Sequence, residues 1–183
     1  MKHFTTPDMP ALSLDADEAT VLQDDATPTD QKVYDLHEEP TDALVVCCAD
    51  SRFLSAIDDF LKDIGITNPA MIMVPGSVKA IGLQAIIPKQ WHTLQHQLEL
   101  MATRNAHVPR VILFTHEECR SYAASAKLLR GFTRVSDAQR DHLMKLSKFL
   151  MKEYLPGAKF ELYHAAIVPR GATRGVQFRT ISA

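Results

Sequence analysis

The sequence predicts an α/β fold in which a mainly parallel sheet of four strands is flanked by helices. From residue 41 onward, short apolar runs typical of buried strands alternate with longer segments of helical periodicity, as in β-α-β units. Polar residues of metal-binding or catalytic type follow directly after two of these runs. Since ligand sites of open α/β sheets collect at the carboxyl ends of the strands, we expect a functional site there.

Four short apolar runs are the predicted strands. The valine-rich run 43–48 is the first, and the others are 70–74, 110–114 and 160–166. Residues 175–181 alternate apolar and polar side chains, which makes them a candidate fifth strand at an edge of the sheet.

Two helices are predicted from their apolar side chains. Residues 53–64 carry an apolar stripe of helical spacing, and Gly65 is placed to end that helix. Pro88 suits the first turn of a second helix, which extends to about residue 105. Between these helices, the Pro-Gly-Ser sequence 75–77 predicts a turn whose backbone can come close to a ligand.

Two further helices are predicted to begin at capping boxes. In this motif a hydroxyl side chain and a glutamate or glutamine three residues later satisfy free N–H groups of the first helical turn. Thr115 and Glu118 form the first box, before a helix that extends to about Arg130. Ser136 and Gln139 form the second, before another apolar stripe.

Composition indicates one globular domain in a reducing compartment. The 183 residues suffice for a full core, and a formal net charge of −2 provides no attraction to nucleic acid or to a membrane surface. No apolar run approaches the ~20 residues that cross a bilayer. Three cysteines, two of them adjacent, are a poor disulfide framework, and the first residues lack the apolar segment of a secretory signal. We therefore expect a cytoplasmic protein.

Charge divides the chain into an acidic N-terminal arm, residues 1–40, and the α/β domain, residues 41–183. The arm holds ten Asp or Glu and two Lys, which is net −8, so the remainder is net +6 (−2 minus −8). Few large apolar residues and several prolines separate the arm from the core. Two interpretations stay open, a solvated tail and an arm that lies along a partner subunit.

Candidate metal ligands follow the first predicted strand. In an extended chain Cys48 and Asp50 point to the same side, while Cys47 points to the opposite face and is interpreted as a core residue. Arg52 places a cation two residues beyond the carboxylate. A thiolate and a carboxylate with their own counter-charge are half of a metal site.

The other half follows the third predicted strand. His116 and Cys119 are three residues apart, and on one face of the predicted helical turn both could face a metal. A helix N-terminus also favours the thiolate, which is the metal-binding form of cysteine. Together, Cys48, Asp50, His116 and Cys119 form a four-ligand set suited to tetrahedral Zn²⁺.

These residues carry a resemblance to a known family. The segment from Cys48 to Arg52 resembles the Cys-x-Asp-x-Arg motif of β-class carbonic anhydrases, and His116-x-x-Cys119 resembles their His-x-x-Cys motif. The similarity covers roughly residues 43–166 and is greatest to a shorter, divergent branch, in which a tyrosine such as Tyr122 follows the second cysteine.

The resemblance implies an enzyme that reversibly hydrates carbon dioxide to bicarbonate by a zinc-bound hydroxide. Cys48, His116 and Cys119 would hold the metal. Asp50 would be either the fourth ligand, which closes the site, or the partner of Arg52, in which case it orients the hydroxide. The family also implies a homodimer or a higher homo-oligomer, whose subunits exchange N-terminal arms. From the net charge and the apolar runs we expect no nucleic acid or membrane partner.

The sequence departs from the family at two places. Arg120 replaces the glycine that usually follows the second metal cysteine, and the segment 74–77 lacks the usual arginine and asparagine. A pocket that is partly blocked or attracts anions is expected from Arg120. A hydrolase of a related small substrate, carbonyl sulfide or carbon disulfide, is therefore an alternative.

Two other function classes remain. A non-catalytic zinc protein would use Asp50 as a permanent fourth ligand, because a structural site has four protein ligands. A cysteine-nucleophile enzyme would pair Cys119 with His116, and it would need a third orienting group and no metal.

The other polar residues are interpreted as structural. Glu117 and Glu118 are expected in a solvated first helical turn. The arginines of segment 170–179 fit an edge strand with outward charge better than a nucleic-acid site. Histidines outside the motifs are interpreted as surface residues (His92, His96) or as packed or surface residues (His142, His164).

Overall fold

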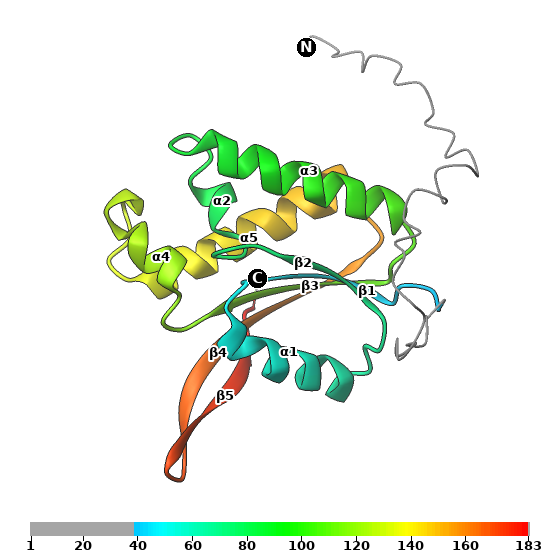
Figure 1. Cartoon of the computed structure of the whole chain (residues 1–183). Coiled ribbons are helices and arrows are strands. Elements are labelled where there is room, and N and C mark those ends of the chain that lie inside the picture. The colour runs from blue at the N-terminus through cyan, green and yellow to red at the C-terminus, as the bar shows by residue number, and fades with distance from the viewer. Residues whose placement is uncertain (1–38, 183) are drawn as a thin grey trace, which may run out of the picture. The chain divides into compact units, whose positions relative to one another are not determined.

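A five-stranded sheet forms the centre of the computed structural model, which describes residues 39–182 (Figure 1). The strand order is β2-β1-β3-β4-β5. Neighbouring strands among β1 to β4 pair in parallel, and β5 pairs antiparallel to β4. The predicted mainly parallel sheet of four strands is therefore confirmed, and the candidate fifth strand lies at its edge, where the structure shows that it is antiparallel. The strands are β1 (Ala43–Cys47), β2 (Pro69–Met73), β3 (Arg110–His116), β4 (Lys159–Arg170) and β5 (Thr173–Thr180).

Helices cover both faces of the sheet (Figure 1). Helix α1 (Ser51–Asp63) lies on one face, and α3 (Pro88–Arg104) and α5 (Val135–Glu153) lie on the other, together with the single turn α2 (Lys79–Gly82). The α2 turn has no counterpart among the predicted helices. Helix α4 (Arg120–Ala124) is short and is followed by a 3₁₀ turn at Ala126–Leu128. Helices on both faces of a largely parallel sheet define a doubly wound α/β fold.

Alternation along β1 builds two separate cores. Leu44 and Val46 pack on the side of α3 and α5, whereas Val45 and Cys47 pack on the side of α1. Cys47 is fully buried there, as the alternation predicts. A third, smaller cluster lies at the carboxyl end of the sheet and contains Cys48.

The predicted helix start at Thr115 is wrong. β3 continues through His116, and Thr115 lies in the β3–β4 ladder opposite His164, whose ring its hydroxyl contacts. The backbone N–H of Glu117 donates one more bond to β4, so α4 begins only at Arg120 and ends at Ala124. Pairing with β4 satisfies these backbone groups better than a local capping box would, and tertiary structure overrides the capping signal.

The second capping box is also wrong. Helix α5 begins at Val135, and no side chain of residues 39–182 caps its N-terminus. The Gln139 side chain donates instead to the carbonyl of His116 at 2.8 Å, so the residue ties α5 to the end of β3.

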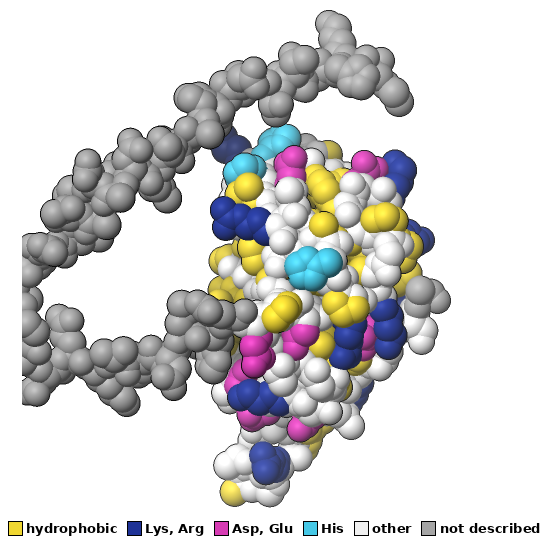
Figure 2. All heavy atoms as spheres, turned by 90° about the vertical axis from the view of Figure 1, so that its right-hand side faces the viewer, with side chains coloured by type: hydrophobic (Ala, Val, Ile, Leu, Met, Phe, Trp, Pro, Cys, Tyr) yellow, Lys and Arg dark blue, Asp and Glu magenta, His cyan; other side chains and the backbone are white. Residues whose placement is uncertain are grey.

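Several predictions concern residues or surfaces at the margins of the fold. Most of the arm, residues 1–38, lies outside the described part of the chain. Within residues 39–182 no helix combines the length and apolarity that crossing a bilayer requires. On the face shown in Figure 2, basic and acidic side chains are interspersed, so the described part has no uniform basic surface there.

Packing of α2 against α5 leads to a prediction about stability. A Cβ atom added at Gly82 would lie 1.8 Å from Nε2 of His142, inside the ring's own volume. We expect Gly82→Ala to lower the free energy of unfolding by about 1–3 kcal/mol, because the buried ring must move. Gly157→Ala is the matched control, since nothing lies within 4 Å of a Cβ there. Urea unfolding of both variants and of the wild type measures this difference. A Gly82→Ala variant as stable as the wild type would contradict the packing described.

Candidate metal centre

Three of the four predicted ligands, Cys48, His116 and Cys119, meet where the strand order reverses. β2 lies on one side of β1 and β3 lies on the other, and the crevice beyond the carboxyl ends of such strands is where doubly wound folds bind ligands. Cys48 directly follows β1, and His116 is the last residue of β3. Cys119 follows three residues later and directly precedes α4. Two local motifs 68 residues apart (116 − 48) are thus brought to one edge.

Cys48, His116 and Cys119 form a compact, buried group of donor atoms. One ligand atom of each lies within 4.8 Å of the others, and the two sulfur atoms are 3.9 Å apart. Tetrahedral zinc with Zn–S bonds of about 2.3 Å would separate two sulfur ligands by about 3.8 Å. The group can therefore hold a metal ion, and its dimensions fit zinc with one position left over.

His116 is oriented as a ligand. Its Nδ1 lies 2.7 Å from the carbonyl oxygen of Glu117, and because a carbonyl only accepts, Nδ1 carries the proton. Nε2 is then a lone-pair acceptor, and it is buried without a hydrogen-bond partner among the described residues. Buried polar atoms rarely stay unpaired, and this bonding of the second ring nitrogen is typical of metal-binding histidines.

The two thiols share one environment. The thiol of Cys119 lowers the pKa of Cys48, and His116 and the Gly76 N–H, which donates to the Cys48 sulfur at 3.2 Å, act in the same direction. The same thiol pair, together with burial, raises the pKa of Cys119. The first proton of the pair leaves easily and the second is held. A metal would have to displace that second proton, which makes binding depend on pH.

Gly76 allows the turn at 75–77 to approach this closely. Its φ is +85°, and a Cβ there would lie 2.8 Å from Oγ of Ser121. A side chain would strain the backbone and push the turn away from Cys48. The close approach predicted for this turn thus occurs at the thiol of a candidate ligand.

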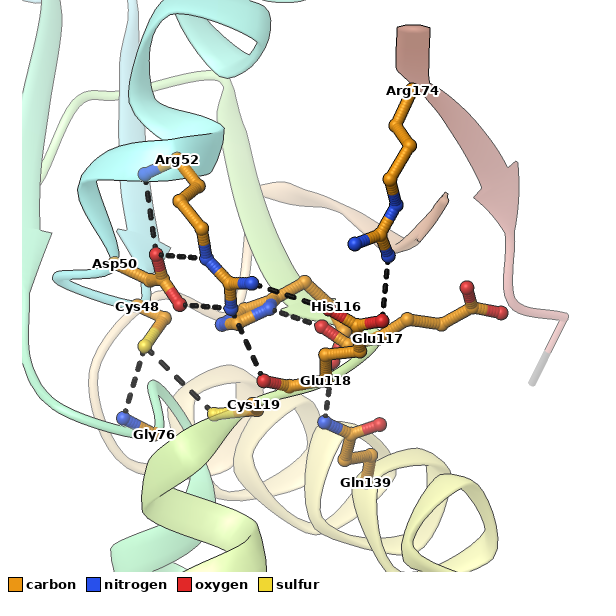
Figure 3. Close-up of polar contacts among 10 residues, drawn as sticks. All are labelled: Cys48, Asp50, Arg52, Gly76, His116, Glu117, Glu118, Cys119, Gln139 and Arg174. Carbon is orange, nitrogen blue, oxygen red and sulfur yellow. Dashed lines mark hydrogen bonds and ion pairs between the residues drawn. The ribbon is translucent and has the colours of Figure 1, made fainter. Parts of the chain in front are cut away.

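Asp50 lies outside the group of three donors and pairs with Arg52 (Figure 3). Its carboxylate accepts from Arg52 Nε at 3.0 Å and from Nη2 at 2.7 Å, and it also caps α1 through the Arg52 backbone N–H. These bonds to Arg52 lower the pKa of Asp50 to about 2. In this arrangement the carboxylate is ionised and held by the guanidinium.

Glu117 and Glu118 do not form a solvated helical turn, and that expectation is wrong. Glu118 has a φ of +52°, and its carboxylate contacts Arg52 at 3.2 Å and Arg174 at 2.6 Å. Glu117 accepts a bond from the backbone N–H of Ile167 at 2.8 Å. Sequence spacing offers no signal for these contacts, because their partners lie 50 to 66 residues away in the chain.

A cavity of about 290 Å³ opens beside the donor group. Its lining includes Cys48 and Asp50 together with Pro75, Arg120 and Ser121. Arg120, which was expected close to the metal position, therefore lies in the wall of this cavity. The wall of this cavity therefore includes a cationic side chain.

The sequence offers no sign that Lys79 lies beside the candidate ligands. It is only 5% exposed, and its ammonium donates to the Ser121 carbonyl at 3.1 Å and to the Ser125 hydroxyl at 3.0 Å. Burial lowers its pKa, which the nearby thiols oppose. It ties the α2 turn to α4, next to Cys119. A lysine in an unassigned segment carries no pattern that would have revealed this.

The four histidines interpreted as surface or packed residues are found in those environments. His92 and His96 are exposed on α3. His142 is fully buried, with Nδ1 3.0 Å from the hydroxyl of Tyr122, and His164 packs against Thr115. Tyr122 thereby links α4 to α5 behind the metal centre.

Comparison with known proteins finds similarity only among solved structures. No family model and no curated protein matches the sequence. A β-carbonic anhydrase, isoform I (TvaCA1) of the protozoan Trichomonas vaginalis, is 14% identical, covers 79% of this chain and 87% of its own, and has a TM-score of 0.39. A structure from two tetrameric β-carbonic anhydrases of the ascomycete Sordaria macrospora is 14% identical over 75% of this chain and 81% of its own, with a TM-score of 0.40. At such distance, function has to be inferred from the geometry of the site.

Metal content tests the donor group. We expect the purified protein to bind about one zinc per chain, and Cys48→Ala and Cys119→Ala to lose it together with thermal stability, because metal binding to a folded site stabilises the fold. Cys47→Ala is the matched control, since Cys47 adjoins Cys48 but faces the α1 core. Elemental analysis and melting curves give the result. Retained zinc in the Cys48 or Cys119 variant would rule out that residue as a ligand.

The buried His142 predicts a pH effect on stability. Burial lowers its pKa from 6.5 to about 4. Between these values the unfolded chain binds a proton that the folded protein does not, so stability falls as the pH drops, by up to about 3 kcal/mol. His142→Gln should remove this part of the decline. Urea unfolding of both proteins between about pH 7 and pH 4.5 measures it, and parallel curves would contradict the prediction.

Proposed function

We propose that this protein is a zinc-dependent enzyme that reversibly hydrates carbon dioxide to bicarbonate. One observation carries the proposal: three buried nitrogen and sulfur donors lie close together, while Asp50, the carboxylate that lines the adjacent cavity, is held by Arg52. Three protein ligands with an open fourth position distinguish catalytic from structural zinc sites. The motif resemblance supports the same assignment.

Cys48, His116 and Cys119 are the proposed ligands. Zinc bound by them would lower the pKa of water towards ~7 and so supply a nucleophile at neutral pH. The Glu117 carbonyl fixes the tautomer of His116, and the Gly76 N–H stabilises the Cys48 thiolate. Both contacts come from backbone atoms, which hold the donors in place before any metal arrives.

Asp50 is the proposed hydrogen-bond acceptor for the attacking water. With a pKa of about 2 it is ionised at neutral pH and can only accept, so it fixes the direction of the water's proton. Arg52 holds the carboxylate by two parallel bonds, an arrangement that sets its orientation as well as its charge. Asp50 also lines the cavity beside Cys48, which is where carbon dioxide would enter.

Arg120 is proposed to act on the product. Its side chain is exposed and contributes to the wall of the same cavity. A cation there attracts bicarbonate and other small anions. The usual glycine of the family would leave this wall uncharged. We therefore expect Arg120 to affect the rate of the reverse reaction and the inhibition by anions.

The alternatives make different demands on the site. A structural zinc site needs Asp50 as a fourth ligand, and the bidentate contact with Arg52 works against that. A Cys119 nucleophile needs His116 as its base without a metal, and stoichiometric zinc would exclude it. Carbonyl sulfide or carbon disulfide hydrolysis uses the same open site, and assay of each substrate on zinc-loaded protein separates the three activities.

We also propose a cytoplasmic homodimer or higher homo-oligomer. β5 is an edge strand among the described residues, with one side of its ladder free to pair. Light scattering coupled to gel filtration measures the assembly, and a monomer at all concentrations would contradict it.

Stopped-flow hydration of carbon dioxide by zinc-verified protein tests the function. We expect activity in the wild type and a loss of roughly 10²-fold or more in Asp50→Asn with zinc retained, because a positioned proton acceptor contributes on that scale. Asp58→Asn is the matched control, a carboxylate on the same helix that pairs with Lys62 away from the cavity.

Two results would count against these assignments. A zinc-loaded wild type without activity would refute carbon dioxide hydration as the function. Full activity in Asp50→Asn would refute the role given to Asp50 and leave the metal site intact.

A further inference from the structure

Four charged side chains of alternating sign form a chain at the rim of the metal centre (Figure 3). Asp50 contacts Arg52 at 2.7 Å, Arg52 contacts Glu118 at 3.2 Å, and Glu118 contacts Arg174 at 2.6 Å. They come from three segments: the start of α1, the loop between β3 and α4, and strand β5. The resemblance accounts for Asp50 and Arg52 and leaves Glu118 and Arg174 without a role.

Glu118 is held in a backbone conformation that side chains rarely adopt. Its φ is +52°, in the left-handed region that normally favours glycine. Such conformations persist when the surroundings hold them, and they cluster at functional sites. Here the preceding residue, Glu117, is fixed to β4 at both its N–H, which donates to Ala165, and its carboxylate, which accepts from Ile167.

This conformation turns two acceptors of Glu118 towards Arg52. Nη1 of Arg52 donates to the Glu118 carboxylate, and Nη2 donates to the Glu118 carbonyl, each at 3.2 Å. A guanidinium is planar, with its donors in a fixed fork. Anchoring Nη1 and Nη2 on Glu118 therefore sets the plane in which Nε and Nη2 face Asp50.

Arg174 in turn orients Glu118. The two carboxylate oxygens are divided between the arginines: Oε2 accepts from Arg52, and Oε1 accepts from Arg174. Arg52 and Arg174 also line one cavity of about 210 Å³, whose other lining residues carry no charge. Glu118 is thus the acidic side chain that connects the two.

We propose that Arg174 is a positioning residue of the metal centre, which acts through Glu118 to hold Arg52 on Asp50 and so keeps the fourth metal position free of the Asp50 carboxylate. The inference rests on the proposed metal ligands and goes beyond the proposed reaction. It makes strand β5, distant in sequence from every ligand, part of the balance between an open and a closed site. Without Arg174, Glu118 loses one of its two partners and Arg52 loses a fixed anchor.

The size of the effect follows from exposure. The side chains of Arg52, Glu118 and Arg174 are 40%, 51% and 60% exposed, and ion pairs of this kind are individually weak. We expect Arg174 to shift the occupancy of the fourth position by roughly two- to five-fold, the range that one exposed pair supports. The shift should be smaller at high salt, which screens such pairs.

Binding of azide to the cobalt(II)-substituted protein, followed by visible absorption, is the test. An external anion enters the fourth position only where Asp50 does not occupy it. We expect Arg174→Met to weaken azide binding by roughly two- to five-fold. Arg179→Met is the matched control, an arginine of the same strand whose side chain contacts Gln177 instead, and it should leave azide binding unchanged.

A double-mutant cycle with Asp50→Asn isolates the route. Since asparagine does not compete as an anionic ligand, Arg174→Met should have no effect on azide affinity in that background. An unchanged affinity in Arg174→Met alone, an equal loss in Arg179→Met, or the same loss in the Asp50→Asn background would each overturn the inference.

The outcome is separable from that of the proposed function. If the wild type fails to hydrate carbon dioxide but the azide affinities follow the cycle, the reaction is wrong and the role of Arg174 stands. If hydration occurs and the double-mutant cycle shows no coupling, the proposed reaction stands and the role of Arg174 is wrong. A wild type that takes up no cobalt overturns the ligand assignment and the inference together.

Discussion

Parallel pairing of β1 with β3 is the constraint on which the rest of this structure depends. With Val46 opposite Leu113, Cys48 comes level with Thr115, one residue before His116, so Cys48 and His116 emerge at the same edge of the sheet. The order of the strands reverses there, and the following helices diverge to opposite faces of the sheet. A crevice at this point is a consequence of the topology. A one-residue slip of either strand would turn its side chains to the other face and separate the donors.

The site separates its acids by depth. The soft donors, Cys48 and Cys119, are buried, and they are served by backbone N–H groups and by the nearby ammonium of Lys79. The carboxylates of Asp50 and Glu118 lie at the rim, and each has an arginine partner. The two buried thiols are both deprotonated only when a metal cation replaces their protons. The rim carboxylates are ionised whether or not a metal is bound. The interior is therefore suited to binding a metal and the rim to orienting what binds to it.

The β4–β5 hairpin extends past the strand that it supports. β3 pairs with β4 as far as Ala165, while β4 continues to Arg170 and within residues 39–182 pairs there with β5 alone. This extension supplies the Ile167 N–H for Glu117 and the Arg174 side chain for Glu118. The short loop between His116 and Cys119 is thus held from outside by an element that contributes no ligand. Rigid support of this kind is what keeps a group of donors in place before a metal binds.

The amino-acid sequence alone predicts the α/β class, the parallel sheet with its edge strand, the placement of polar residues at strand ends and the three donors that converge. These features depend on local patterns, namely apolar periodicity and two short motifs, whose physical basis lies in residues that are neighbours in the sequence. Other features depend on tertiary contacts. Thr115 lies in a strand and not at a helix start, and Gln139 ties α5 to the end of β3. Lys79 is buried, and Glu118 contacts Arg174. A capping box stabilises one turn, whereas pairing with β4 satisfies a whole run of backbone groups, so the ladder prevails. Contacts between residues far apart in the chain arise only when the fold brings them together, and no local pattern encodes them.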